Sequence, residues 1–520
     1  MLRENRVFSE MSDDQQEVLA FLSRGAGVER IDTHVSAIFL IGDRAYKVKR
    51  AVALSYLDYS TLALRHRFCR AELELGRRMA PKLYLGLRAI TRERDGDLAL
   101  DGAGEPIEWA VEMRRFDQET LFDRLAEKGA LTPLLMRRLA DEIAAFHAEA
   151  EAFTREGGSS TVRFVIDDSH TNLRLGVDIL PEAGIETLLH RSHEALARLA
   201  PLLDRRRAEG KLRHCHGDLH LRNICLLDGE PTLFDGIEFS ETLARIDVLY
   251  DLAFLLMDLE HRKLGGLGNL VFNRYLDRTG DVGGLAALPL FMSMRAAIRA
   301  HVNVAARARQ ASAESAARTA EEARSYLSLA LKLLRPRPRV LVAVGGLSGT
   351  GKSTLAQELA AGLGPAPGAR IVRTDVLRKR MMGAAPETRL PPEAYARDVS
   401  ERVYAAFRAE VAAALDGGHA AIADATFVDP PERAAIEAIA TRAGVPFLGF
   451  WLEAPPEVLT ARIGARRDDA SDADIAVLRR QLGYDLGAIG WRRIDVSGGA
   501  AGALARLRAV IAERRERPPT

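Results

Sequence analysis

Cysteine is scarce in this chain, whose 520 residues include only Cys69, Cys215 and Cys225. An odd number of cysteines without C-x-x-C spacing argues against a disulfide framework or a zinc site and favours a reducing compartment. The first residues lack the apolar core of a signal peptide, and the most apolar run, residues 249–259, contains two aspartates. These absences predict a soluble, cytoplasmic protein that does not enter a membrane.

Net charge is also nearly absent. The formal charge is +1 and the isoelectric point is about 7.8, so no overall field draws the chain to nucleic acid or to an anionic membrane. Lysine is rare within this balance, with nine lysines among the 73 lysine and arginine residues. A lysine at an expected phosphate-contacting position is therefore unusually informative, and Lys47 and Lys352 are two such residues.

The length and segmentation of the chain predict two domains. At 520 residues it exceeds what one hydrophobic core usually organises. Residues 335–339 read Arg-Pro-Arg-Pro-Arg, which cannot continue a helix, so this segment is the predicted linker. We expect a two-lobed α+β domain over 1–334, with lobes over 25–116 and 117–334. An α/β domain with a mostly parallel sheet is expected over 340–520.

Hydrophobic periodicity predicts the main elements of the first domain. The expected elements are a short helix over 12–24, strands over 37–41 and 45–49, an amphipathic helix over 61–78, and a strand over 109–113. Lys47 lies on the second strand. Beyond Phe116 the pattern is mostly helical apart from a strand-rich segment at 212–239, and the Ala- and Arg-rich stretch 304–324 is expected to form one surface helix.

A compound motif follows in the second lobe. Residues 216–223 read His-Gly-Asp-Leu-His-Leu-Arg-Asn, the spacing of a kinase catalytic loop, and Asp235 follows twelve residues after Asn223. Between them, Asp228-Gly229 separates two apolar runs, which is a strong signal of a β-hairpin. Pairing its arms brings Asn223 and Asp235 to the same end, where two oxygen ligands could share Mg²⁺. Asp218 precedes the hairpin and is the candidate to deprotonate an acceptor hydroxyl.

These motifs resemble those of the aminoglycoside phosphotransferase-like branch of the protein-kinase-like fold, over residues 30–330. Further matching segments are Thr33-His34-Val35-Ser36, Tyr46-Lys47-Val48-Lys49-Arg50 and Leu57-Asp58-Tyr59-Ser60-Thr61. The resemblance implies Asp218 as catalytic base and Asn223 and Asp235 as metal ligands. It also implies that Lys47 contacts the α- and β-phosphates of ATP, with Glu72 as its helix partner. Lys49 and Glu74 are alternatives for this pair.

The resemblance to this family also indicates what kind of molecule accepts the phosphate. Gly217 stands where protein kinases have arginine, and no Ala-Pro-Glu follows, so a small-molecule acceptor is expected. His216 either braces the loop or ionises in the reaction, and bracing is favoured because Asp218 already serves as the base. Four later acidic residues, Glu238, Glu241, Asp247 and Asp251, could attract a cationic aminoglycoside, although Asp251 could instead cap or anchor a helix. Related kinases act on sugars, amino alcohols and amino acids, and the sequence does not select among them.

A second phosphate-binding signature begins at Gly346. A buried strand over 340–344 precedes G-x-x-x-x-G-K-S, and a helix is expected over 354–359. Glycines let backbone amides surround phosphate oxygens, the lysine reaches the β- and γ-phosphates, and the serine binds Mg²⁺. The residues expected to bind nucleotide here are Gly346, Ser348, Gly349, Thr350, Gly351, Lys352, Ser353 and Thr354.

Three further segments carry candidate residues for this second site. Asp424 ends a buried strand. Its expected role is that of a metal ligand or a catalytic residue, with a capping role as the alternative. Asp375 and Arg378 follow another strand, where small P-loop kinases hold the acceptor. Beyond a helix, the expected mobile lid carries arginines that close on the transferring phosphate, with solvated arginines as the alternative. The lid residues are Arg462, Arg466, Arg467, Asp468 and Asp469.

Residues 340–510 resemble small P-loop kinases, an AAA-type ATP-binding group related to gluconate kinase and polynucleotide 5′-hydroxyl kinases, and Asp375 matches their acceptor-activating aspartate by position. We therefore expect a bifunctional phosphotransferase that uses ATP and Mg²⁺ and acts on hydroxyls of small molecules. One alternative is a P-loop ATPase switch regulated by a kinase-like, ligand-sensing domain. Another is a polynucleotide 5′-hydroxyl kinase, which the lack of a basic-aromatic stripe disfavours.

Overall fold

The structure, a computed structural model, describes residues 13–33, 35–54, 57–308, 310, 312–465 and 470–516. The chain divides into two compact units. The first unit comprises residues 1–161 and 205–255, and the second comprises residues 162–204 and 256–520.

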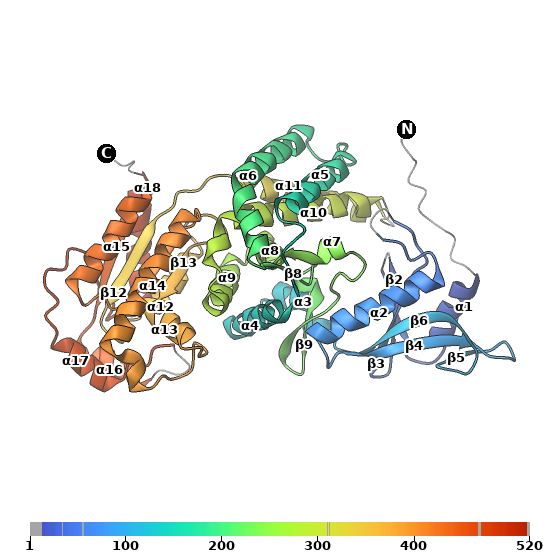
Figure 1. The fold of residues 1–520 in the computed structure, drawn as a ribbon, viewed down its shortest axis with the longest axis horizontal. Coiled ribbons are helices and arrows are strands. Elements are labelled where there is room, and N and C mark those ends of the chain that lie inside the picture. Colours follow the sequence, from blue (N-terminus) through green and yellow to red (C-terminus); the bar gives the residue numbers. More distant parts are fainter. Residues whose placement is uncertain are drawn as a thin grey trace. The chain divides into compact units, whose positions relative to one another are not determined.

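The first unit begins with a six-stranded antiparallel sheet of order β1-β2-β3-β6-β4-β5, with α2 along it (Figure 1). Its elements are α1 (Asp13–Leu22), β1 (Glu29–Asp32), β2 (Ser36–Ile41), β3 (Arg44–Lys49), α2 (Leu62–Met79), β4 (Tyr84–Arg92), β5 (Leu98–Leu100) and β6 (Glu105–Arg114). Val48 packs against α1, whereas the adjacent Lys47 reaches α2. Because adjacent strand residues point to opposite faces, the two helices cover opposite faces of the sheet.

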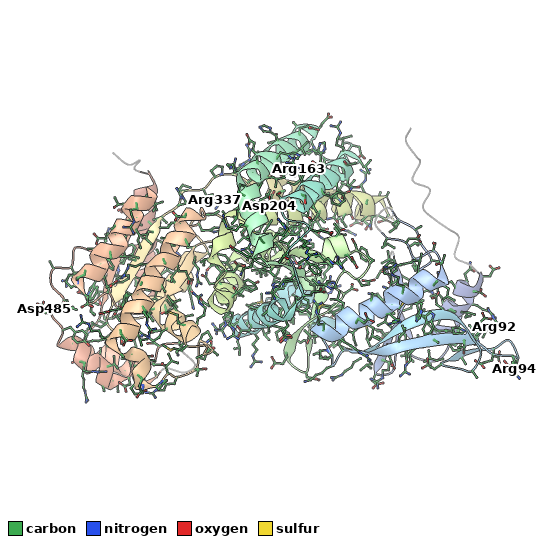
Figure 2. The ribbon with its side chains drawn as sticks, viewed as in Figure 1. Arg92, Arg94, Arg163, Asp204, Arg337 and Asp485 are labelled. Carbon is green, nitrogen blue, oxygen red and sulfur yellow. The ribbon has the colours of Figure 1, made fainter. Side chains whose placement is uncertain are left out.

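Charged side chains lie on the outside of this sheet, as Arg92 and Arg94 show (Figure 2). Arg92 lies 2.9 Å from Asp14 and 2.6 Å from Glu17, so it ties the end of β4 to the exposed face of α1.

The rest of the first unit is mostly helical and contains the predicted hairpin. Its elements are η1 (Gln118–Thr120), α3 (Phe122–Glu127), α4 (Pro133–Glu149), β7 (Ala152–Phe153), β8 (Leu212–His214), η2 (Leu221–Asn223), β9 (Ile224–Leu227), β10 (Glu230–Leu233), α7 (Glu241–Ala244), β11 (Arg245–Asp247) and most of α8 (Val248–His261). β9 and β10 pair antiparallel, with Leu233 opposite Ile224. Asp228 and Gly229 adopt φ of 54° and 81°, as a tight hairpin turn requires. The hairpin prediction is confirmed.

The second unit combines helices from the middle of the chain with a parallel sheet. The helices are most of α5 (Ser159–Arg174) and α6 (Glu182–Ala208), with α9 (Gly265–Thr279), η3 (Val282–Ala287), α10 (Leu288–Arg307) and α11 (Ala313–Leu333). Residues 335–339 have neither helix nor strand, and Arg337 among them is exposed (Figure 2). The use of this segment as a domain boundary stays a prediction.

The single surface helix predicted over 304–324 is wrong. α10 ends at Arg307 and α11 begins at Ala313, because the Ser312 hydroxyl accepts the amide of Ser315 at 3.1 Å and caps a new helix. Ala320 and Ala323 are buried, so this stretch also contributes to a core.

Among the described residues, one segment, Val282–Arg307, is long and apolar enough to cross a membrane. Because 67% of its apolar window is buried inside the structure, it has the character of a core helix.

The parallel sheet has the order β13-β14-β12-β15-β16, and all its paired strands run parallel (Figure 1). Its elements are β12 (Leu341–Gly346), α12 (Lys352–Ala360), β13 (Arg370–Arg373), α13 (Thr374–Met381), η4 (Pro392–Tyr395), α14 (Arg397–Asp416), β14 (Ala421–Asp424), α15 (Pro430–Ala443), β15 (Phe447–Glu453), α16 (Pro456–Gly464), α17 (Ile475–Leu482), β16 (Arg492–Asp495) and α18 (Ala500–Glu516). Val342 and Val344 pack with Leu359 and Leu507 of α12 and α18. The carboxyl ends of the strands share one edge, where ligands bind in such sheets.

The turn of the β9–β10 hairpin provides a test of the fold. Gly229 has open space around it, so alanine there would meet no atom but would be held in left-handed backbone. We expect Gly229→Ala to cost about 1 kcal/mol and to lower the Tm by about 2–4 °C. Thermal unfolding measures this, with Gly266→Ala in α9 as control, since it also has open space and no positive φ. An unchanged Tm for Gly229→Ala would contradict the turn.

Candidate active sites

The first site is organised around Glu72, a buried carboxylate on α2. Lys47 Nζ lies 2.7 Å from Glu72 Oε1 and also bonds Asp235 Oδ1. Lys49 lies on the same strand face, and its Nζ lies 2.7 Å from Glu72 Oε2 and bonds Glu238. Glu72 is 2% exposed, so one carboxylate that is almost out of water holds both lysines.

Glu74, the alternative partner, lies elsewhere. Its side chain is 70% exposed and lies 3.5 Å from Arg70. Lys47 and Lys49, which the sequence left as alternatives, instead share one partner.

The pKa values show that this cluster stays charged. Burial alone would lower the pKa of Lys47, but Asp235 and Glu72 outweigh it and hold that pKa well above its ordinary value. Glu238 and Glu72 do the same for the pKa of Lys49. Burial alone would raise the pKa of Glu72, yet the two lysines lower it. A fixed positive charge therefore stands beside Asp235 at neutral pH.

The catalytic-loop residues lie together as the motif predicts. Asn223 Nδ2 donates to Asp218 Oδ2 at 2.9 Å and to the Asp218 carbonyl at 3.0 Å. His220 Nε2 lies 3.3 Å from Asp218 Oδ2, and the Asp218 side chain is 39% exposed. The carboxylate is thus held by its neighbours while remaining open to solvent, which suits a group that must meet an acceptor hydroxyl.

The hairpin brings Asp235 next to this loop. The Phe234 amide donates to the Asn223 carbonyl at 3.0 Å, and the Asp235 amide donates to the Tyr84 hydroxyl at 3.0 Å. Asp235 has φ of 60°, a left-handed value that a non-glycine residue adopts at a cost and that is common at functional sites. The Asn223 side-chain oxygen accepts no hydrogen bond from the described residues, so it and the Asp235 carboxylate fit the oxygen ligands that Mg²⁺ prefers.

Asp251 binds the backbone of the catalytic loop rather than capping a helix. It lies inside the first turn of α8, fully buried. Its two oxygens accept the amides of His216 at 3.1 Å and Gly217 at 2.9 Å, and His147 Nε2 lies 3.1 Å away. The loop backbone before Asp218 is therefore fixed by a carboxylate that solvent does not reach.

His216 braces the same loop. Its Nε2 donates to the Phe234 carbonyl at 2.8 Å, and its Nδ1 accepts the Asp218 amide at 3.2 Å. Burial lowers its pKa, so the ring stays neutral at physiological pH. This geometry supports bracing over ionisation.

The four acidic residues expected to attract a cation are engaged within the protein. Glu238 accepts the Tyr59 hydroxyl at 2.6 Å besides bonding a lysine. Asp247 pairs with buried Arg206 at 2.7 Å, and Glu241 pairs with Arg245 at 2.9 Å. Asp251 is also engaged, so of the four only Glu241, whose side chain is 74% exposed, presents its carboxylate to solvent.

The P-loop follows β12 as predicted. Gly346, Gly349 and Gly351 adopt φ of 141°, 89° and 83°, which favour glycine. A Cβ at Gly349 would lie 2.8 Å from the Leu459 carbonyl. The loop runs directly into α12, so Lys352 to Thr354 occupy the helix N-terminus, where anions bind.

The lysine and serine of this motif occupy defined positions. Lys352 Nζ donates to the Gly346 carbonyl at 2.9 Å and to the Leu347 carbonyl at 3.0 Å. Ser353 Oγ donates to Asp424 Oδ2 at 2.6 Å. Ser348 and Thr350 are buried within the loop. The serine hydroxyl keeps its lone pairs for a cation, which fits the predicted metal site.

Asp424 is buried in this site, where it accepts the Ser353 hydroxyl and pairs with Arg373, rather than serving only as a helix cap. It is 4% exposed, and Arg373 Nε lies 3.4 Å from its Oδ2. Burial raises its pKa, although Arg373 and Lys352 act in the opposite direction.

Asp375 and Arg378 share the helix α13. Asp375 is half-buried in the first turn. Arg378 is 6% exposed, donates to the Ala394 carbonyl at 2.7 Å, and lies over the ring of Tyr395 at 4.8 Å. Three residues apart on a helix, the two side chains lie on one face.

The lid prediction needs a correction. Arg462 lies in the last turn of α16 rather than beyond it, because Pro456 starts the helix and the turn continues to Gly464. Its guanidinium donates to the Val496 carbonyl at 2.7 Å. Arg466, Arg467, Asp468 and Asp469 lie outside the described residues, as does His34 of the segment that matches the phosphotransferase-like family.

Comparisons with known proteins match a different family to each of the two candidate sites. The sequence profile of the phosphotransferase enzyme family matches residues 59–288, and that of an AAA domain matches residues 341–484. The uncharacterized proteins Rv2004c of Mycobacterium tuberculosis and Mb2027c of Mycobacterium bovis are each 30% identical over 479 residues, 90% of this chain and 92% of theirs. The chain belongs to their family. Both of its matched parts belong to kinase or phosphotransferase families, so this is a two-domain phosphotransferase.

Two solved structures are similar to parts of this phosphotransferase. A choline/ethanolamine kinase family protein from Mesorhizobium loti is 16% identical, with a TM-score of 0.39, and the match covers 62% of this chain and 99% of that one. A gluconokinase from Sinorhizobium meliloti 1021 is 21% identical, with a TM-score of 0.24, and the match covers 35% and 99%. The predicted fold class, a kinase-like α+β domain followed by a P-loop α/β domain, is confirmed by the family matches and the sheet topology.

Several residues of the phosphotransferase's second site escaped sequence reasoning. The Ser348 amide donates to Gln481 Oε1 of α17 at 2.9 Å, and no sequence motif predicts this contact. Lys379 is fully buried and lies 3.1 Å from Asp472, which also accepts the Tyr395 hydroxyl at 2.6 Å. The rarity of lysine in this chain was the available signal for Lys379.

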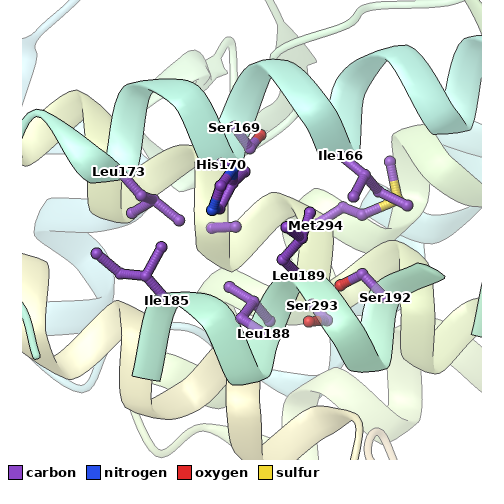
Figure 3. Close-up of a pocket in the computed structure, with 11 residues that line it drawn as sticks. Ile166, Ser169, His170, Leu173, Ile185, Leu188, Leu189, Ser192, Ser293 and Met294 are labelled. Atoms are coloured by element: carbon purple, nitrogen blue, oxygen red, sulfur yellow. The ribbon is translucent and has the colours of Figure 1, made fainter. Parts of the chain in front are cut away.

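A small pocket is formed among α5, α6 and α10 (Figure 3). Its walls are mainly aliphatic, with Ile166, Leu173 and Leu188 among them, and Ser169 and His170 add polar atoms. None of the residues predicted for either phosphotransferase site lines it, so it is not the expected acceptor site.

The shared carboxylate provides a pH-dependent test. Glu72→Gln should lower the free energy of unfolding by about 3 kcal/mol at pH 7, because two buried lysines lose their common negative partner. The folded pKa of Glu72 is about 2, against an ordinary value of 4.5. Its stabilisation is therefore complete above pH 4.5 and is lost as the pH falls toward 2. Urea unfolding of the variant and the wild type across this range should show the difference shrinking.

Glu74→Gln is the matched control on the same helix. Because its side chain is exposed, it should leave stability unchanged at every pH. Equal effects of the two substitutions would contradict the assigned role of Glu72.

Proposed function

We propose that this protein is a bifunctional ATP- and Mg²⁺-dependent phosphotransferase, in which each domain transfers the γ-phosphate to a hydroxyl of a small molecule. The observation that carries the proposal is the presence of two separate sets of phosphate-transfer groups. One set pairs Lys47 with Asp235 beside the catalytic loop, and the other joins Lys352, Ser353 and Asp424 at the P-loop.

In the first site, Asp218 would accept the proton of the acceptor hydroxyl as its oxygen attacks the γ-phosphorus and the bond to ADP breaks. Asn223 holds that carboxylate in place, which supports this role. Lys47 would hold the α- and β-phosphates. A magnesium ion bound by Asn223 and Asp235 would offset the negative charge of the triphosphate.

The pairing of acidic residues bears on the proposed acceptor of the first site. Glu238, Asp247 and Asp251 are paired within the protein, so attraction of a cationic aminoglycoside has less support than binding of a neutral polyol such as a sugar. Backbone and side-chain hydrogen bonds would then select the substrate.

In the second site, Lys352 would leave its loop carbonyls for the β- and γ-phosphates, while Ser353 and Asp424 hold the cation. Asp375 at the start of α13 is the proposed acceptor-activating group, and Arg378 on the same face is its proposed neighbour. Arg462, in the last turn of α16, is the proposed arginine that contacts the transferring phosphate.

The thiols support a reducing, cytoplasmic location. Cys69, Cys215 and Cys225 are buried, and none of them forms a disulfide. Burial raises the pKa of Cys69 and of Cys225 to about 12, so these thiols have little tendency to form disulfides.

Transfer of labelled γ-phosphate from ATP to a pooled small-molecule library tests the proposal. Asp218→Asn should reduce labelling of one product by about 10²–10⁴-fold, because the base is lost, and spare a second product. Lys352→Ala should abolish the second and spare the first.

Three results would contradict this assignment. Loss of both products in one variant would mean that the sites are not independent. No product from any version, with ATP hydrolysis lost only in Lys352→Ala, would favour a P-loop switch with a kinase-like sensor. Labelling of a 5′-hydroxyl oligonucleotide would instead indicate a polynucleotide kinase.

A further inference from the structure

The edge of the parallel sheet is covered by a helix that precedes the P-loop domain in the chain. β13 is an edge strand, paired only with β14 within the sheet, so alternate backbone groups on its other side need partners. The Arg370 amide points inward and donates to the Ala420 carbonyl at 2.9 Å. The neighbouring Ile371 amide therefore points outward, toward α9 (Figure 1).

Two asparagines of α9 satisfy this edge. Asn273 Oδ1 accepts the Ile371 amide at 2.8 Å, and its Nδ2 donates to the Ala369 carbonyl at 3.1 Å. The side-chain amide of Asn273 thus makes the two hydrogen bonds that the N–H and C=O groups of one residue in a further parallel strand would make. One turn earlier, Asn269 Nδ2 donates to the Ala369 and Pro367 carbonyls at 3.1 Å each.

A buried ion network secures the same contact. Arg370 is 2% exposed, and its guanidinium lies 2.6 Å from Asp277 of α9 and 2.6 Å from Glu410 of α14. Glu410 also bonds Arg380, whose guanidinium donates to the Leu276 carbonyl at 3.0 Å. Two cations and two anions balance, so the pairing offsets part of the cost of burial, although burial still raises the pKa of Asp277. Removal of one charge would leave another without its partner.

The strand held in this way leads into the second site. Three residues after Arg370, Arg373 lies 3.4 Å from Asp424, and the chain then enters α13 with Asp375 in its first turn. Displacement of β13 would move the proposed acceptor-activating group while leaving the P-loop, on β12 and α12, in place.

We propose that α9 is a positioning element of the P-loop site. Asn273 and Asp277 fix the edge of β13 and so hold Asp375 for transfer, which means that the phosphotransferase-family segment completes the second domain. α9 lies within residues 59–288 and β13 within 341–484, and the mycobacterial relatives span both segments. The kinetic part of this proposal rests on the proposed function of the P-loop domain.

The test compares three variants of the full chain. Asn273→Leu removes the side-chain bonds to the Ile371 amide, the Ala369 carbonyl and the Arg370 guanidinium. Asn273→Asp keeps an oxygen for the Ile371 amide and for Arg370 and loses the donor to Ala369. Asn303→Leu is the matched control, because Asn303 is also 7% exposed and its side-chain amide donates to its own helix at Arg299. Hydrogen exchange resolved at the Ile371 amide is the first readout, and P-loop-dependent phosphate transfer is the second.

We expect Asn273→Leu to speed exchange at Ile371 by about tenfold or more, with exchange also faster over residues 374–381 and unchanged over 346–353. The kcat of the P-loop activity should fall by about tenfold, with the KM for ATP within about twofold. Asn273→Asp should retain most of the protection at Ile371, and Asn303→Leu should behave as wild type.

Unchanged exchange at Ile371 in Asn273→Leu would overturn the proposal. So would equal changes in Asn303→Leu, or a rise in KM matching the fall in kcat, since these indicate general loosening. If the wild type shows no Lys352-dependent transfer, the proposed function fails, while the exchange at Ile371 still decides whether α9 holds β13.

Discussion

A charged side chain that leaves water must find an opposite charge, because burial without a partner costs several kcal/mol. Lys47 and Lys49 meet this constraint by sharing Glu72, and Arg370 meets it by pairing with Glu410 and an aspartate of α9. In each case the pairing fixes a strand relative to a helix. Lys47 lies on one of these strands and Asp375 lies just after the other, so the positions of these two residues depend on the buried pairs.

The two proposed sites use different backbone arrangements to hold a triphosphate. In the first, a hairpin returns Asp235 to the catalytic loop, and buried Asp251 holds the backbone of that loop. In the second, glycines turn the chain tightly at the end of β12 and a helix N-terminus follows. In the proposed function, each arrangement would supply a lysine, oxygen ligands for a cation and a carboxylate for the acceptor, as phosphoryl transfer requires.

Sequence patterns predicted the features that depend on local chemistry. Asp228-Gly229 specified its hairpin and the spacing of the P-loop specified its strand, loop and helix, because both signals act over a few residues. Long-range partners were not predictable in this way. Nothing in the sequence shows that Glu72 serves two lysines, that Asp251 accepts loop amides from inside a helix, or that Asn273 caps a strand 98 residues away. The break before α11 was missed because the pattern is alanine-rich on both sides of it.

The central claim is that one chain carries two independent nucleotide sites, and a binding stoichiometry tests it most directly. Calorimetric titration of the full chain with a non-hydrolysable ATP analogue and Mg²⁺ should give two sites per chain in the wild type. Lys47→Ala and Lys352→Ala should each give one, with the remaining affinity unchanged. A single site in the wild type, or loss of both sites in either variant, would contradict the account.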